Sequence, residues 1–222
     1  MILTPIAPEV LAGALDRFMA RLSDRFSRAV FGRIRATAPD RATGMEAERH
    51  RLAALSVARV FGIAIYPEAT RCRFNWDGVA LYGATEAYVI LHEVAHFALA
   101  PPERRGLVEF GLGPGPDTLD RAAAERAAAL SPLEREADEA AASLLGIVWE
   151  AALGQPALAS FLDQNWLEGL ERSAPAHFTG VLATLRCSGA LNFRLTPAAA
   201  TAPKRGRGPH CLSRWRRPLP RH

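Results

Sequence analysis

The chain has 222 residues, of which 49% are hydrophobic and 23% are charged. These values are typical of a globular protein, and this length accommodates one domain with a sizeable core. The net charge of +4 is unevenly distributed, because residues 197–222 alone carry +7 and leave −3 for the rest. We therefore expect a mildly acidic domain over residues 1–195 and a basic, Pro- and Arg-rich, disordered tail over 196–222. This distribution argues against nucleic acid as a partner, except through the tail.

The cysteines and the apolar runs bear on the compartment. The three cysteines are odd in number and widely spaced, which fits neither a closed disulfide set nor a zinc knuckle and favours a reducing compartment. No charged segment followed by an apolar core opens the chain, and His92, Glu93 and His96 interrupt its longest apolar stretch. We therefore expect neither a signal peptide nor a membrane span, and a cytoplasmic location.

Apolar residues at intervals of three and four predict a mainly helical chain. Between residues 62 and 83, β-branched and aromatic residues mix with Pro67, Gly78 and Gly83, which predicts one or two short strands. The expected fold is thus a single α+β domain with a small sheet. Its expected parts are a helical scaffold in residues 1–62, a core in 63–153 and closing helices in 154–195. Helices are expected at 8–34, 46–61, 85–100, 133–153, 157–172 and 176–187, with a turn-rich loop at 111–118.

The sequence HEVAH, with His92, Glu93 and His96, lies near the middle of the helix expected at 85–100. Residues four apart on a helix lie one turn apart on the same face, so both imidazoles can bind one metal ion. Glu93 then lies beside the ion without binding it, where its carboxylate can act as an acid or base toward a bound water. The alternative, two buried histidines with structural roles, leaves the Glu93 carboxylate without an evident partner in apolar surroundings.

A third metal ligand is expected from the helix at 133–153, which begins with four acidic residues. On a helical projection, Glu134 falls within the apolar arc of this helix and Asp138 at its edge, whereas Glu136 and Glu139 project from the other side. A carboxylate on a buried face needs a partner, and a metal ion would supply one. We therefore expect Glu134 as the third ligand and Asp138 as the acceptor of a histidine N–H. A partly exposed helix start with ordinary acid–base pairs is the alternative.

Arg104 and Arg105 follow the motif helix directly, after Pro101 and Pro102 have ended it. Near the mouth of a metal site, the two guanidinium groups are expected to bind an anionic or carbonyl group of a substrate. Because the chain is rich in arginine, two ordinary surface residues are the alternative.

A longer pattern continues beyond the histidine motif. An aromatic residue follows it, then a pair of arginines, an LVEFG segment and a Pro-Asp, in order and without a gap. The pattern consists of His92, Glu93, His96, Phe97, Arg104, Arg105, Leu107, Val108, Glu109, Phe110, Gly111, Pro116 and Asp117. It resembles the elongation factor P hydroxylase family. Further likeness in the helix at 133–153, in GQP (154–156) and in NWLEG (165–169) extends the resemblance to about half of the chain.

The resemblance implies a metal-dependent hydroxylase that modifies a lysine-derived side chain of a protein partner, elongation factor P. The implied cofactor is one divalent metal ion at a two-His-one-carboxylate centre. This ligand set is that of non-haem iron oxygenases, so Fe²⁺ is favoured, but it also suits Zn²⁺. If the third ligand is chosen by its spacing to the GQP segment, as in the family, and not by the helix face, it becomes Glu136 or Glu139. The long helical amino-terminal part, residues 118–131 and the basic tail do not match the family.

Two other function classes remain open. The histidine motif with Glu134-x-x-x-Asp138 resembles the gluzincin zinc peptidases, and EREADEAAASLL (134–145) resembles the regulatory peptidases of the ImmA/IrrE type. These resemblances imply a zinc-dependent metallopeptidase with Glu93 as its base. The basic tail, in turn, is compatible with a module that binds nucleic acid or protein, which deletion of residues 197–222 would test through salt-dependent binding.

Overall fold

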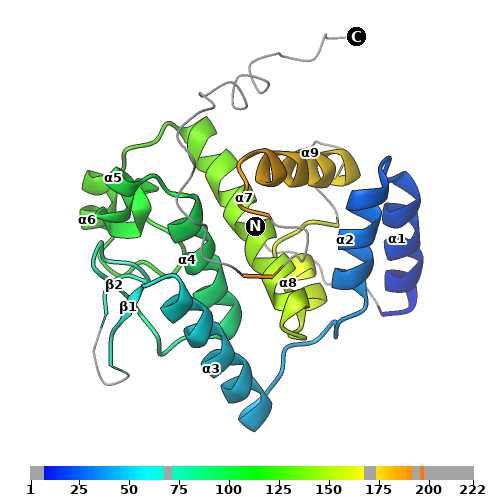
Figure 1. Cartoon of the computed structure of the whole chain (residues 1–222), viewed down its shortest axis with the longest axis horizontal. Helices are drawn as coiled ribbons and strands as arrows, with labels where there is room; N and C mark the ends of the chain where they lie inside the picture. Colours follow the sequence, from blue (N-terminus) through cyan, green and yellow to red (C-terminus); the bar gives the residue numbers. More distant parts are fainter. Residues whose placement is uncertain (1–7, 68–71, 168–173, 192–195, 198–222) are drawn as a thin grey trace.

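The computed structural model describes residues 8–67, 72–167, 174–191 and 196–197, so nearly all of the expected basic tail lies outside the described residues. The structure confirms a mainly helical α+β fold with one small sheet (Figure 1). In chain order its elements are α1 (Pro8–Arg21), α2 (Arg25–Arg35), α3 (Gly44–Val60), β1 (Ala64–Ile65), β2 (Ala80–Leu81), α4 (Ala87–Leu99), α5 (Pro102–Arg105), the 3₁₀ helix η1 (Val108–Gly111), α6 (Arg121–Ala127), α7 (Pro132–Ala152), α8 (Ala157–Asp163) and α9 (Ala174–Cys187).

Helix α7 runs through the middle of the molecule, with α3 and α4 on one side and α1, α2 and α9 on the other (Figure 1). It packs closely against α4, the helix that carries the histidine motif. Where the two helices meet, a Cβ atom on Gly146 would lie 3.4 Å from the backbone nitrogen and Cα of His92. A Cβ atom at Gly146 would just touch the backbone of His92, so a larger side chain there would press against α4.

The predicted limits of both motif-bearing helices are confirmed within about two residues. Helix α4 ends at Leu99, just before Pro101 and Pro102. Helix α7 begins with Ser131 as its N-cap and Pro132 in its first turn. Helix α8 is shorter than the predicted 157–172, since it ends at Asp163, and residues 168–172 of that prediction lie outside the described part.

The prediction of a single helix over residues 8–34 is wrong, because the structure has two helices there, α1 and α2. The break falls at residues 22–24, and a carboxylate oxygen of Asp24 accepts a hydrogen bond of 2.8 Å from the backbone N–H of Ser27. Such a cap satisfies a donor that the start of a helix leaves open, and so favours a new helix there. The apolar period continues across the break because both helices bury one face in the same core, where Phe18 and Phe31 lie with ring centroids 4.6 Å apart.

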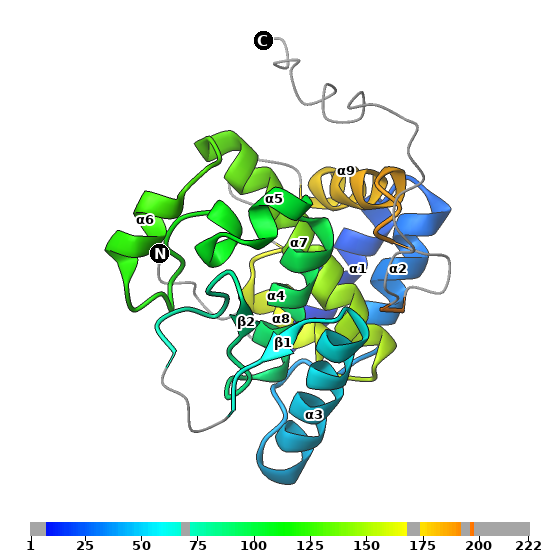
Figure 2. The ribbon, with the colours of Figure 1, turned by 60° about the vertical axis from the view of Figure 1, so that its left-hand side comes forward.

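The sheet consists of two parallel strands of two residues each, in which Ala64 pairs with Ala80 and Ile65 with Leu81. It lies next to α3 (Figure 2). The segment before β2 is held to the sheet by a bridge between Trp76 and Leu81, which fixes Asn75 near α4.

Among the described helices, none combines the length and the apolar character needed to cross a membrane.

Candidate metal centre

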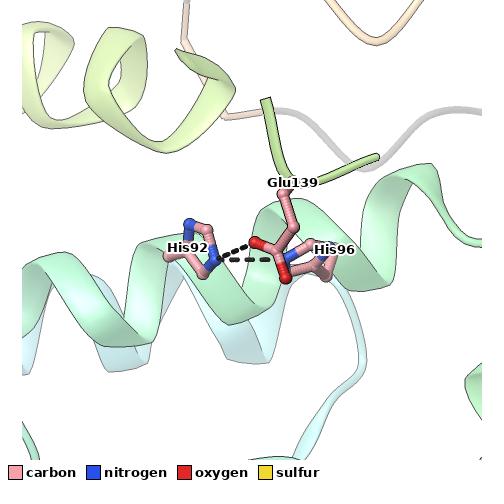
Figure 3. A group of neighbouring side chains, drawn as sticks. All are labelled: His92, His96 and Glu139. Carbon is pink, nitrogen blue, oxygen red and sulfur yellow. Dashed lines mark hydrogen bonds and ion pairs between the residues drawn. The ribbon is translucent and has the colours of Figure 1, made fainter. Parts of the chain in front are cut away.

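Two histidines of α4 lie one helical turn apart and direct their rings to a common point. The Nε2 atoms of His92 and His96 are 3.0 Å apart, and the ring centroids are 4.6 Å apart (Figure 3). Two nitrogens that bind one metal ion at about 2.1 Å are separated by roughly 3 Å. The spacing of the histidines therefore fits a shared ion.

Glu139 of α7 completes the group. Its Oε2 lies 3.4 Å from the Nε2 atom of each histidine, and its carboxylate points toward both rings (Figure 3). One ligand atom from each of His92, His96 and Glu139 lies within 4.8 Å of the other two. Two imidazole nitrogens and one carboxylate oxygen suit both Zn²⁺ and Fe²⁺. The three residues thus fit one divalent metal ion.

Glu134, the expected third ligand, lies elsewhere. It occupies the first turn of α7, where its Oε2 accepts hydrogen bonds from the backbone N–H (3.0 Å) and the hydroxyl (2.7 Å) of Ser131. The neighbouring Leu133 is 64% exposed, so the predicted apolar arc is not buried at this end of the helix. Glu136 is exposed as well. The structure therefore groups Glu139, and not Glu134, with the two histidines, and Glu139 is one of the two alternatives that the family spacing allowed.

Asp138 connects the centre to Arg104. One of its carboxylate oxygens lies 3.0 Å from Nδ1 of His96, and the other accepts a hydrogen bond of 2.5 Å from the Arg104 guanidinium group. Burial raises the pKa of Asp138, but His96 and Arg104 outweigh it and hold the pKa below its usual range. The charged carboxylate can only accept, so His96 donates its Nδ1–H and turns Nε2 toward the ligand group. Asp138 thus makes the contact expected from the sequence.

The charges at the centre favour a cation between the ligands. Burial lowers the pKa of His92, and the neighbouring His96 lowers it further. Burial also lowers the pKa of His96, but its hydrogen bonds to Asp138 and Glu139 outweigh this and raise the pKa to about 10. For Glu139, burial is outweighed by the two histidines, which hold its pKa far below the usual range. The carboxylates therefore draw positive charge to this point, and a metal ion would supply that charge.

Glu93 lies in the wall of a cavity beside the histidines and is 7% exposed. Its Oε1 accepts a hydrogen bond of 3.5 Å from the side-chain amide of Asn75. Burial raises the pKa of Glu93 to about 8, although His96 acts in the opposite direction. A carboxyl group with a pKa near neutrality can both take up and release a proton, as acid–base catalysis requires. This placement is compatible with the role expected for Glu93.

Glu109 is a second buried carboxyl group of the cavity, and its role was not predicted from the sequence. It lies in η1, where Glu109 and Phe110 have φ angles of 46° and 52°, values that are uncommon for residues other than glycine. Its Oε1 accepts hydrogen bonds from the backbone N–H of Asn75 (3.3 Å) and the hydroxyl of Thr118 (3.2 Å). Burial raises the pKa of Glu109 to about 7. The signal available in the sequence was the acidic residue within the LVEFG segment.

Arg104 and Arg105 are not among the residues that the structure places in the wall of this cavity, contrary to the contact with a substrate that the sequence led us to expect. Arg104 is buried and bonded to Asp138. Arg105 donates a hydrogen bond of 2.9 Å to the carbonyl of Ala100, and its guanidinium group lies 4.7 Å from the ring centroid of Phe97. Both side chains turn toward α4 or α7 because α5 follows α4 after a two-residue connection.

The cavity has a volume of about 550 Å³. Of the charged residues that the structure places in its wall, all are acidic or histidine. Trp166 and His177 form another part of the wall, where their rings stack with centroids 5.2 Å apart. The acidic wall residues are Glu93, Glu109, Asp117 and Glu139. The cavity therefore combines a metal-binding group, acidic walls and an aromatic surface.

No protein-family model, curated protein or solved structure matches this chain. A functional assignment therefore depends on the geometry of the centre and its cavity.

Proposed function

We propose that this chain is a metal-dependent hydroxylase that acts on a modified lysine side chain of a translation factor resembling elongation factor P. The metal ion, Fe²⁺ in this proposal, would be held by His92, His96 and Glu139. The observation that carries the proposal is spatial. The segment that resembles the hydroxylase family, residues 92–117, supplies both histidines and part of the cavity wall, including Glu109.

Two further residues of the matching pattern, Phe110 and Arg104, lie outside the cavity wall. Phe110 contacts His96 directly, and Arg104 contacts it through Asp138. Phe110 stacks on His96, with ring centroids 5.6 Å apart, and on Trp76, with centroids 5.2 Å apart. Arg104 contacts Asp138, which in turn holds His96. Residues of one continuous pattern thus meet around one centre, which supports a common function for them.

The cavity charge supports an amine substrate. A lysine-derived side chain carries an ammonium group, which would favour the ionised forms of Glu93 and Glu109 against the burial that raises their pKa values, whereas cationic walls would repel it. Glu139 would be occupied by the metal ion, whereas Glu93, Glu109 and Asp117 would face the substrate. Because Glu109 is held by Asn75 and Thr118, its carboxylate is fixed in advance of binding, which lowers the entropic cost of recognition.

Fe²⁺ at a two-His-one-carboxylate centre supplies the activation of dioxygen. Hydroxylation inserts one oxygen atom of dioxygen into a C–H bond, and the other oxygen leaves as water at the expense of two electrons and two protons from an external reductant. In this proposal Glu93 would exchange protons beside the ligands, and Glu109 would bind the ammonium group of the substrate. The buried position of both groups strengthens these interactions relative to bulk water.

The test is to incubate the iron-loaded protein with modified elongation factor P, dioxygen and ascorbate as the reductant. The proposal predicts a mass increase of one oxygen atom on the modified lysine and consumption of dioxygen. Both should be absent with His96→Ala and with Glu139→Gln. Unchanged substrate mass with wild-type protein that retains its iron would overturn the proposal.

A zinc metallopeptidase is the second candidate, favoured by the position of Glu93 directly after a metal ligand. A buried carboxyl group with its pKa raised to about 8 suits a base that activates water for peptide hydrolysis. The test is cleavage of a fluorogenic peptide library by zinc-loaded protein. Glu93→Gln should abolish cleavage and keep zinc, whereas loss of zinc in this variant would argue against the catalytic role.

A further inference from the structure

Arg104 is a buried cation whose position is set by the end of α4. Pro101 and Pro102 end that helix and start α5, and the backbone N–H of Arg104 donates to the carbonyl of Pro101 at 3.0 Å. The side chain of Arg104 is only 11% exposed. A guanidinium group in such a place needs a partner, because an unpaired buried charge is strongly destabilising.

The partner of Arg104 is the carboxylate that holds a candidate ligand. Nη2 of Arg104 lies 2.5 Å from Oδ2 of Asp138, and Oδ1 of Asp138 lies 3.0 Å from Nδ1 of His96. Nη1 of Arg104 also donates to the carbonyl of Phe110 at 3.4 Å. Asp138 is therefore bonded through both oxygens to cationic or N–H donors, which are the stronger class of hydrogen bond.

This double attachment has a consequence for the imidazole. A carboxylate bonded through only one oxygen can rotate and turn its acceptor away from the imidazole. Arg104 opposes this rotation, because it fixes the second oxygen of Asp138. The Nδ1–H of His96 then keeps its acceptor, and the Nε2 of His96 keeps its direction toward the metal.

We infer that Arg104 is a positioning residue of the metal centre, which acts through Asp138 on His96. This role replaces the substrate contact expected for Arg104. The inference rests on the proposed metal centre but not on the reaction that takes place there. It applies equally to an iron hydroxylase and to a zinc peptidase.

Arg105 provides a matched control. It is the next residue, belongs to the same short helix and has its own partly buried contacts, to Ala100 and Phe97. No contact in the described structure links Arg105 to Asp138 or to the ligand group. Arg104→Met and Arg105→Met therefore remove the same charge from adjacent positions, and only the first removes the support of Asp138.

The experiment measures Zn²⁺ affinity of the full chain by competition with a chromophoric chelator. Partners of ligating histidines typically change metal affinity 10- to 100-fold, so Arg104→Met should weaken binding by about that factor. Arg105→Met should stay within about threefold of wild type. Arg104→Lys, which keeps the charge but not the planar fork, should lie between wild type and Arg104→Met.

A double variant tests whether the effect passes through Asp138. In the Asp138→Ala background, adding Arg104→Met should change affinity by less than about twofold, because the carboxylate that it supports is already gone. This variant also removes both buried charges together, so it avoids leaving one of them unpaired. Circular dichroism of the metal-free proteins establishes that each variant is folded.

Two results would overturn the inference. One is wild-type Zn²⁺ affinity in a folded Arg104→Met protein. The other is a double variant whose fold-loss of Zn²⁺ affinity equals the product of the losses in Arg104→Met and Asp138→Ala. That result would mean that Arg104 acts independently of Asp138. Failure of the wild-type chain to bind Zn²⁺ or Fe²⁺ at all is a different outcome, because it would reject the metal centre and with it the proposed function.

Discussion

Glu150 lies on α7, the helix that also carries Glu139 and Asp138, and its side chain is buried at 2% exposure. Its Oε2 accepts a hydrogen bond of 2.7 Å from the hydroxyl of Ser160, and the guanidinium group of Arg41 lies 3.7 Å away. Burial raises the pKa of Glu150 from its ordinary value of 4.5 to about 8, against the lowering effects of Ser160 and Arg41. We predict that Glu150→Gln removes a large pH dependence from the free energy of unfolding of the protein.

The sign follows from the protons bound in each state. Between about pH 5 and pH 8, Glu150 is ionised in the unfolded chain and protonated in the folded one, so its contribution to stability falls as the pH rises. A pKa difference of about 3.5 corresponds to at most about 5 kcal/mol, and the part lost between pH 5 and pH 8 is about 3 kcal/mol. A glutamine at this position cannot ionise, and its carbonyl can still accept from Ser160.

The assay is urea unfolding at pH 5, 6, 7 and 8. The free energy of unfolding of Glu150→Gln, relative to wild type, should rise by about 3 kcal/mol across this range. Glu103→Gln, which changes an exposed glutamate in α5, should follow the wild-type pH profile. A constant difference between Glu150→Gln and wild type from pH 5 to pH 8 would refute the reasoning.

Two further predictions concern the centre itself. Gly146→Val places side-chain atoms against the backbone of His92, so it should lower the free energy of unfolding by about 1–3 kcal/mol and weaken Zn²⁺ binding. Gly180→Val in α9, where a Cβ meets no atom within 4 Å, is the control, and equal effects at both sites in urea unfolding and zinc titration would contradict the account. Glu93→Gln should keep the metal but lose turnover of the substrate, measured as metal content and product. Full turnover would remove Glu93 from the reaction.

Local patterns in the sequence predicted the elements that carry the site. The signals that start or stop a helix are short-range. The end of α4 could therefore be predicted from Pro101 and Pro102, and Ser131 and Pro132 mark the start of α7. The spacing of His92 and His96 likewise sets their relation on any regular helix. The break at Asp24 was missed because apolar periodicity alone does not register a capping residue within a continuous pattern.

Which carboxylate lies beside the two histidines depends on how α4 and α7 pack against each other. The apolar periodicity of each helix gives no information about that packing. The helical projection gave the direction of Glu134, but burial at that turn requires a neighbouring helix, and α7 is exposed there. Ser131-Pro132-Leu133-Glu134 is itself a capping-box sequence, which is typical of a glutamate that caps the helix start. The contact of Arg104 with Asp138 joins residues 34 positions apart and likewise depends on the tertiary structure.

The most direct test of the central claim is the metal content of protein purified anaerobically without added metal. Wild type, Glu134→Gln, Glu139→Gln and His96→Ala would be compared by elemental analysis. The account predicts about one Fe or Zn ion per chain in wild type and in Glu134→Gln, with most of it lost in Glu139→Gln and His96→Ala. Iron would favour the hydroxylase, and zinc would favour the peptidase. Metal retained in Glu139→Gln but lost in Glu134→Gln, or no metal in wild type, would contradict the account.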